Sequence, residues 1–176
     1  MAKLSFYLKI LVNVFLLGIA FQIIRHAVKV LHYIYNGLFD PIYSAGDIIA
    51  NPVSNSLVSL FKLMLFIYLL WLFLKFRKVV YQMRGDTIFF KKNQEMFYRI
   101  GRGTIYYSIG MFLVQLVQKF LENSVTEKSV AYTLGYNLGE SLGDRIPLLI
   151  LALFLLIIAE LISDGYQLKK ENDLTI

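Results

Sequence analysis

Long apolar runs separated by polar segments dominate the pattern of this chain. Four of the runs cover residues 4–24, 57–74, 104–120 and 146–162. Each is about as long as a helix must be to cross the roughly 30 Å hydrocarbon core of a bilayer. The pattern therefore predicts an all-α integral membrane protein, a bundle of four transmembrane helices.

Weaker patterns extend two of these helices. Apolar residues recur at helical spacing from Ala27 to Leu38, so the first helix is predicted to continue until the turn residues near Asp40. Before the third run, Phe97 and Ile100 share one helical face, and charged residues lie mostly on the other. This segment predicts either an amphipathic helix at the membrane interface or a simple extension of the third helix.

The segment before the fourth run contains a small internal repeat. Gly135, Gly139 and Gly143 are four residues apart, beside a parallel stripe of leucines. Glycines at this spacing let another backbone approach closely, and each costs a helix about 1 kcal/mol relative to alanine. We therefore expect these helix-packing glycines to be covered, either by the first outer loop, which we favour, or by a second copy of the chain in a homo-oligomer.

Composition limits the classes of protein. The chain has 176 residues, is 57% hydrophobic and has a mean hydropathy of +0.59, which is too apolar for a soluble domain of this size. A single membrane domain is expected over residues 1–176, because the longest loop, residues 25–56, is too short for a catalytic domain. No cysteine is present, which excludes disulfides and thiolate metal sites.

The positive charge is distributed unevenly. The net charge is +6, and eight of the 18 lysines and arginines lie in residues 75–102, whereas the loops at 25–56 and 121–144 carry few. Because cytoplasmic loops retain positive charge, loop 75–102 is predicted to be cytoplasmic, together with both termini and the tail at 165–176. Basic residues beside membrane segments face anionic lipid, so a direct nucleic-acid partner is not expected.

Two charged residues within the predicted spans suggest an ion pair. Lys9 and Glu160 are both near the inner ends of their spans, at matching depths. Intramembrane ionisable residues are candidates for functional sites, so a Lys9–Glu160 pair is one hypothesis. The alternative is that Lys9 extends to the inner surface and that Glu160 pairs with a cation of the loop, such as Arg77.

A second group of polar residues occupies the outer half of the predicted spans. It consists of Gln22, Lys62, Gln115 and Gln118. These side chains are predicted either to line a small polar cavity open to the outside or, as we favour, to join the helices through hydrogen bonds.

Enzymatic chemistry has little support in the sequence. The two histidines, His26 and His32, are six residues apart and do not share a helical face as a metal-binding pair would. No metalloprotease, nucleophile-elbow or phosphate-loop motif occurs. We therefore predict no catalytic, cofactor-binding or metal-binding residue.

The C-terminal residues carry a family resemblance. The chain ends D-L-T-I after a final span and a G-x-x-L-K-x-E-x-D stretch at residues 165–173, and residues 89–101 read F-F-K-K-N-Q-E-M-F-Y-R-I-G. With the four spans, these features resemble the bacterial four-span family called domain of unknown function 2975. The resemblance implies a bacterial inner-membrane protein whose partner is a small Cro/C1-type helix-turn-helix regulator.

Two cytoplasmic elements are available to such a regulator. The contact residues of the tail would be Leu168, Lys169, Lys170, Asp173, Leu174 and Ile176. Those of the inner loop would be Lys91, Lys92 and Arg99. The apolar end of the tail is expected to dock either on the inner loop of the same chain or on the partner.

Three functions follow from these observations. The first is a non-enzymatic membrane protein that regulates or sequesters the small transcription regulator. The second is a small-molecule or ion permease whose path passes Gln22, Lys62 and Gln115. The third is a structural membrane subunit.

Overall fold

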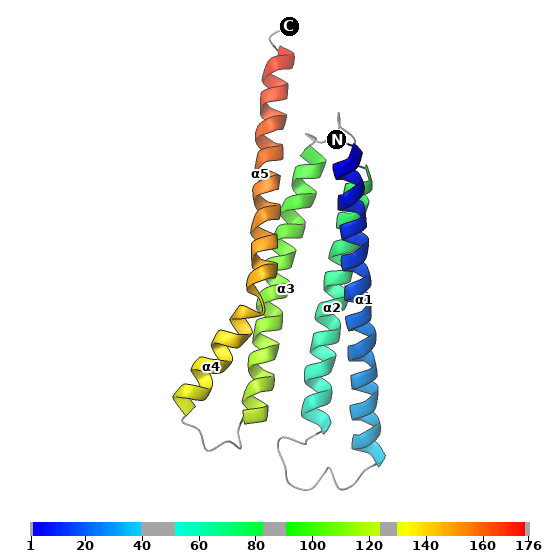
Figure 1. Cartoon of the computed structure of the whole chain (residues 1–176), viewed down its shortest axis with the longest axis vertical. Helices are drawn as coiled ribbons and strands as arrows, with labels where there is room; N and C mark the ends of the chain where they lie inside the picture. The colour runs from blue at the N-terminus through cyan, green and yellow to red at the C-terminus, as the bar shows by residue number, and fades with distance from the viewer. Residues whose placement is uncertain (1, 40–51, 83–90, 124–129, 175–176) are drawn as a thin grey trace. The chain divides into compact units, whose positions relative to one another are not determined.

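The computed structural model describes residues 2–39, 52–82, 91–123 and 130–174, and the described part of the chain is helical except for one turn (Figure 1). The helices are α1 (Ala2–Phe39), α2 (Pro52–Gln82), α3 (Lys91–Asn123), α4 (Val130–Gly143) and α5 (Ile146–Leu174). The turn consists of Asp144 and Arg145, between α4 and α5. The all-α prediction is confirmed for the described residues.

Among the described residues, three helices are long and apolar enough to cross a membrane. They include the candidate spans Lys9–Tyr35, Ser54–Gln82 and Ile146–Asn172, which overlap three of the four predicted spans. The other predicted span, at 104–120, lies within α3, which is not among the three. The apolar residues of α3 are interrupted by tyrosines, glutamines and Lys119, which lower its hydropathy.

The outward faces of these helices are apolar. In the most apolar windows of the three candidate spans, only 22%, 28% and 22% of the residues are buried inside the protein. Large side chains such as Leu17, Leu31 and Ile150 are more than half exposed. Contiguous apolar surface of this extent is unfavourable in water and is expected where lipid is the solvent.

The chain forms two compact units. Unit 1 comprises residues 1–18, 69–106 and 147–176, and unit 2 comprises residues 19–68 and 107–146. Helices α1, α2 and α3 each contribute residues to both units, whereas α4 belongs to unit 2 and nearly all of α5 to unit 1.

The interior of unit 1 is almost entirely apolar. Leu72, Val80, Ile100 and Ala152 are buried there, and Phe76 packs its ring edge-on against Phe97. Helix α3 also approaches α5 closely at Gly101. A Cβ atom at Gly101 would lie 2.8 Å from the Leu156 side chain and 3.1 Å from the carbonyl oxygen of Ala152. The absence of a side chain at this position therefore sets the spacing of the two helices.

The start of α3 resolves one of the alternatives left by the sequence. This helix begins at Lys91 and continues without a break to Asn123, so residues 91–100 extend the third helix. Phe97 and Ile100 are buried on its inner face, whereas Lys91 and Arg99 are exposed. The predicted separation of apolar and charged faces is therefore present along a continuous helix.

Candidate functional site

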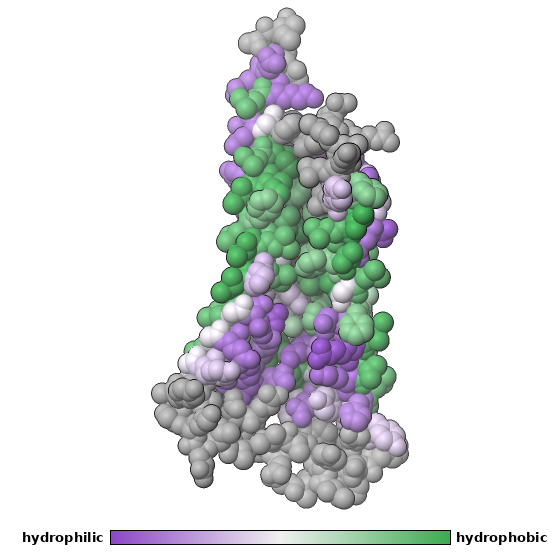
Figure 2. All heavy atoms as spheres, in the orientation of Figure 1, coloured by the Kyte–Doolittle hydropathy of each residue, from purple (hydrophilic) through white to green (hydrophobic). Residues whose placement is uncertain are grey.

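Unit 2 has a polar interior. Six polar side chains are buried among the described residues, and only one of them, Thr104, belongs to unit 1. The other five, all in unit 2, are His26, Ser59, Ser108, Asn137 and Ser141. Figure 2 shows hydrophilic side chains gathered in the lower half of the view, over α4 and the neighbouring helices of unit 2, whereas hydrophobic side chains cover most of α5 of unit 1 up to its hydrophilic end. Because burying polar groups costs free energy unless they are paired, unit 2 is the part of the molecule where a specific site is expected.

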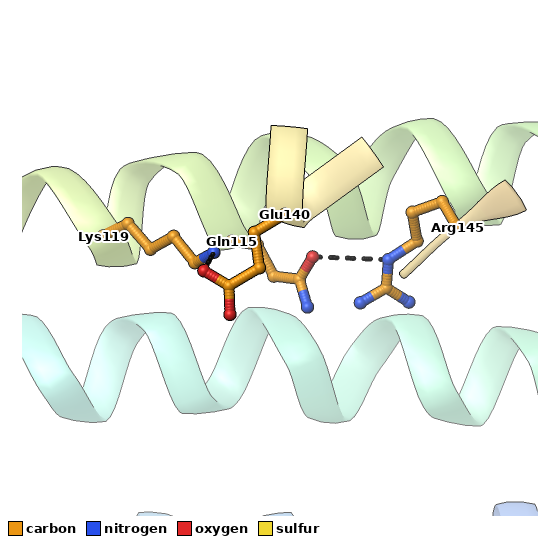
Figure 3. Close-up of polar contacts among 4 residues, drawn as sticks. All are labelled: Gln115, Lys119, Glu140 and Arg145. Carbon is orange, nitrogen blue, oxygen red and sulfur yellow. Dashed lines mark hydrogen bonds and ion pairs between the residues drawn. The ribbon is translucent and has the colours of Figure 1, made fainter. Parts of the chain in front are cut away.

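Helices α3 and α4 meet through polar side chains (Figure 3). The ammonium of Lys119 on α3 lies 2.7 Å from Oε2 of Glu140 on α4. One turn earlier on α3, Oε1 of Gln115 accepts a hydrogen bond of 3.3 Å from Nε of Arg145. The Gln115 amide lies between Glu140 and Arg145 in this view, so one face of α3 contacts both residues.

The backbone at the end of α4 holds Arg145 in place. The Asp144 amide donates to the carbonyl of Glu140 at 3.1 Å, and the Arg145 amide donates to the carbonyl of Leu142 at 2.9 Å. The second bond is of the tighter type that commonly closes the last turn of a helix. The guanidinium of Arg145 also hydrogen-bonds Tyr107, whose side chain is only 3% exposed.

The structure brings together only part of the predicted outer polar group. Lys62 on α2 donates a hydrogen bond to Oε1 of Gln118 on α3, which joins the two helices as expected for interhelical polar contacts. Gln115 instead contacts Arg145. Gln22 is half-buried on α1, and no hydrogen bond links it to the other three residues within the described part of the chain.

His26 and Ser141 each bury a polar atom that has no partner. Nδ1 of His26 and Oγ of Ser141 make no hydrogen bond within the described residues. The His26 ring stacks on Phe66 of α2 at a centroid distance of 5.3 Å, and Lys62 is close enough to act on it electrostatically. Buried polar atoms without partners are rare in proteins, so both positions indicate a place for a further polar group.

In unit 1, the predicted partners Lys9 and Glu160 are not paired. The ammonium of Lys9 lies 5.2 Å from the ring centroid of Tyr81 on α2. Asn13, one turn further along α1, donates a hydrogen bond of 2.9 Å to the Tyr81 hydroxyl. Glu160 is exposed on α5 and forms no ion pair with any residue that the structure describes.

The predicted partner-binding residues at the start of α3 are exposed. Lys91, Lys92 and Arg99 all face outward. Farther along the same helix, the guanidinium of Arg102 donates a hydrogen bond of 2.8 Å to the Tyr106 hydroxyl, which raises the pKa of Arg102. This end of α3 therefore presents several cationic side chains at its surface.

The tail residues continue α5 as a helix to Leu174, and Ile176 lies outside the described residues. Figure 1 shows the last turns of α5 extending beyond the ends of α1 and α3 in the same unit. Leu168 is 66% exposed, and Lys169 and Lys170 are also exposed. The side chains of residues 173–176, which include the apolar end of the tail, lie outside the described residues, so both docking alternatives stay predictions.

The glycines of α4 face outward. A Cβ atom at Gly135, Gly139 or Gly143 would meet nothing within 4 Å. The buried face of α4 is the polar one, which carries Asn137 and Ser141. The expected cover over the glycines is not provided by the residues that the structure describes, and residues 40–51 of the first outer loop lie outside them.

Sequence reasoning missed Arg145, Lys119 and Glu140. Lys119 lies at the end of the third apolar run, whereas Glu140 and Arg145 lie between that run and the fourth, and only the fold brings these two residues to α3. One available signal was the spacing of Ser141 and Arg145, four residues apart at the end of a predicted helix. No group of three or more metal-ligating side chains is found in the described part of the chain.

Comparison with known proteins places the chain in a family. The family model described as "Protein of unknown function (DUF2975)" matches residues 40–176. None of the curated proteins and none of the solved structures matches the chain. The matched region contains α2, α3, α4 and α5, including the tail on which the resemblance rests. Since this match covers most of the sequence, the chain belongs to the DUF2975 family of proteins of unknown function.

Proposed function

We propose that this protein is a non-enzymatic, four-span bacterial inner-membrane protein that binds a small Cro/C1-type helix-turn-helix regulator. The regulator contacts the end of α5 and the start of α3, and its retention at the membrane limits its access to DNA. The observation that carries the proposal is the helical extension of α5, which is exposed and ends in charged residues around Leu168.

The composition of unit 1 supports the proposed topology. Both ends of the chain and the basic segment at 75–102 belong to this unit. In a four-span arrangement, the spans in α1, α2, α3 and α5 bring these three segments to the same side of the membrane. Basic segments favour the cytoplasmic side, which places the start of α3 and the end of α5 where a soluble partner is available. Helix α3, at 33 residues, is about 50 Å long, which is sufficient for a span.

The surface chemistry supports binding of a protein partner. Leu168 is an apolar side chain that is 66% exposed beside Lys169 and Lys170, beyond the apolar part of α5. An exposed helix that carries an apolar residue within a charged segment is suited to dock in a groove of a partner. The exposed cations Lys91, Lys92 and Arg99 on α3 of the same unit provide a second contact surface.

Co-purification from native membranes tests the proposal. The full chain is compared with a chain that lacks residues 171–176, and proteins retained by each are identified by mass spectrometry. A small helix-turn-helix protein retained only by the full chain is the expected result. If neither preparation retains such a protein, the regulator function is wrong, and solute flux in reconstituted vesicles becomes the next measurement.

A pair of point variants locates the contact. Leu168→Ala removes the exposed apolar side chain, and Leu161→Ala is its control, because Leu161 is 61% exposed and lies two turns earlier on the same face of α5. We expect Leu168→Ala to reduce retention of the regulator and Leu161→Ala to leave it unchanged. Equal retention by both variants would show that this face of α5 does not bind the regulator.

A further inference from the structure

Arg145 is a half-buried cation whose partners are neutral. Its side chain contacts the amide of Gln115, at 3.3 Å, and the hydroxyl of Tyr107. Within the described residues, no carboxylate lies within ion-pair distance of it, and the nearby Glu140 pairs with Lys119. A guanidinium carries five N–H donors and stays charged, so contacts with two neutral oxygens leave it incompletely paired.

The position of Arg145 is well defined by its surroundings. The two backbone bonds that close α4 hold its main chain, and Gln115 and Tyr107 of α3 hold its side chain. Preorganised donors bind an anion better than flexible ones do, because less side-chain entropy is lost on binding. Arginine at such a position is suited to a planar or tetrahedral oxyanion, with which it can form two parallel hydrogen bonds.

Ser141 provides a second, independent indication of a ligand. It precedes Arg145 by one helical turn, its side chain is 0% exposed, and its Oγ atom makes no hydrogen bond among the described residues. Ser141 lies in the last turn of α4, on its buried face, and Arg145 follows the end of that helix by two residues. A buried hydroxyl beside an incompletely paired guanidinium can donate to an anion bound by that guanidinium.

The charge balance of unit 2 also favours an anion. The pairing of Lys119 with Glu140 neutralises the Glu140 carboxylate, and the Asp144 carboxylate, which precedes Arg145 in the chain, is exposed to solvent. Lys62, on the neighbouring α2, contacts Gln118, one turn from Gln115 on α3. The polar face of α3 therefore meets cations from α2 and from the end of α4, and an added anion would be attracted to both.

We propose that Arg145, Ser141 and Tyr107 form a binding site in unit 2 for a small oxyanion, a carboxylate or phosphate group. The group belongs either to a soluble ligand or to the headgroup of an anionic lipid. The site uses none of the residues assigned to the regulator, so it stands or fails independently of the proposed function.

The test measures thermal unfolding of the purified full chain in a neutral detergent. Sodium acetate and sodium phosphate replace sodium chloride at constant ionic strength, and a third series adds phosphatidylglycerol to the micelles, with phosphatidylcholine as its reference. At least one probe should raise the melting temperature of the wild type. A rise with acetate or phosphate identifies a soluble ligand, and a rise with phosphatidylglycerol alone identifies a lipid headgroup.

Variants assign the effect to the site. Arg145→Gln should abolish the rise, and Arg145→Lys, which keeps the charge but loses the paired donors, should need about tenfold more probe. Ser141→Ala should stabilise the protein without probe, because it removes an unpaired buried hydroxyl, and should reduce the rise. Arg25→Gln, which removes an exposed positive charge from the same unit, is the control and should respond as the wild type does.

Two results would overturn the proposal. One is a rise of equal size in the wild type, Arg145→Gln and Arg25→Gln, which would be a general effect of the added salt or lipid. The other is a wild-type melting temperature that none of the three probes changes.

Discussion

Lys119 and Glu140 connect α3 to the last turn of α4 through an ion pair of 2.7 Å. The backbone carbonyl of Glu140 also accepts a hydrogen bond from the Asp144 amide, so the same residue participates in closing α4. The side chains of Lys119 and Glu140 are 20% and 49% exposed, and solvent screening therefore weakens the pair. Its main effect is on the orientation of α4 relative to α3. Arg145, which follows α4, is likewise held by Gln115 of α3.

The first prediction concerns this ion pair. Replacing Lys119 by Glu should lower the free energy of unfolding by at most about 1 kcal/mol, because exposed pairs contribute little. Exchanging both charges, Lys119→Glu with Glu140→Lys, should restore most of the loss. Thermal unfolding in detergent measures all three variants. Strictly additive effects of the two substitutions would show that the pair makes no energetic contribution.

Substitution of Gly101 should destabilise unit 1. Replacing a helical glycine by alanine stabilises the helix by up to about 1 kcal/mol, whereas overpacking typically destabilises a protein by about 1–3 kcal/mol. At Gly101 the clash involves the backbone oxygen of Ala152 as well as Leu156, so the cost is expected to exceed the gain.

Gly18→Ala is the matched control for Gly101→Ala. Its Cβ atom would meet nothing within 4 Å, so only the gain in helix propensity remains. The melting temperature should fall for Gly101→Ala and stay equal or rise for Gly18→Ala. A rise for both would show that α3 and α5 separate readily at this point.

Charge reversal at Lys9 should not be rescued at Glu160. Lys9→Glu places a carboxylate beside the electron-rich face of Tyr81, so it should destabilise the protein. Because Lys9 and Glu160 are not paired in the structure, adding Glu160→Lys should not restore stability. Melting temperatures of the single and double variants provide the comparison. Full rescue would instead establish the ion pair proposed from the sequence.

Gly139→Ala should stabilise α4. The position is exposed, and an added methyl group meets no other atom, so the expected gain is about 1 kcal/mol of helix propensity. The melting temperature and the mass of the protein–detergent complex should be measured together. A loss of stability that accompanies a smaller complex would show that a second copy of the chain covers the glycines.

Cysteine labelling tests the topology. The chain contains no cysteine, so single replacements at Tyr136 and Lys91, both exposed, report on two positions separately. In intact cells that express the protein, a membrane-impermeant maleimide should label Tyr136→Cys. Lys91→Cys should react only after the membrane is permeabilised. Labelling of both positions in intact cells would exclude the four-span arrangement with a cytoplasmic inner loop.

Helix positions were largely predictable from the sequence, because periodicity is a local property. The apolar runs at 4–24, 57–74 and 146–162 lie within helices that the structure extends at one or both ends. The polar extensions follow from continued helical spacing, as the end of α1 at Phe39 shows. The run at 104–120 was predicted as a span on the same grounds of length and apolar character, but α3 is not among the candidate spans of the described residues.

The candidate site was only partly predictable, because side-chain partners depend on tertiary packing. Lys62 and Gln118 were grouped by their depth and are joined by a hydrogen bond, but Gln22 was grouped with them and no hydrogen bond links it to either within the described residues. Arg145 was missed because it lies in a turn outside the apolar runs. The inward face of α4 could not be identified, because its glycine and its Asn137–Ser141 faces are both plausible packing surfaces until the neighbouring helix is known.

The polar face of α3 has a consequence for biogenesis in the proposed four-span arrangement. Gln115, Gln118 and Lys119 find their partners on α2 and on the segment that ends at Arg145. Residues of that later segment emerge from the ribosome only after α3. Helix α3 then lacks a strongly apolar surface and the polar partners Glu140 and Arg145, so its entry into lipid requires either the insertion machinery or the already inserted α2 to shelter it until α4 is in place.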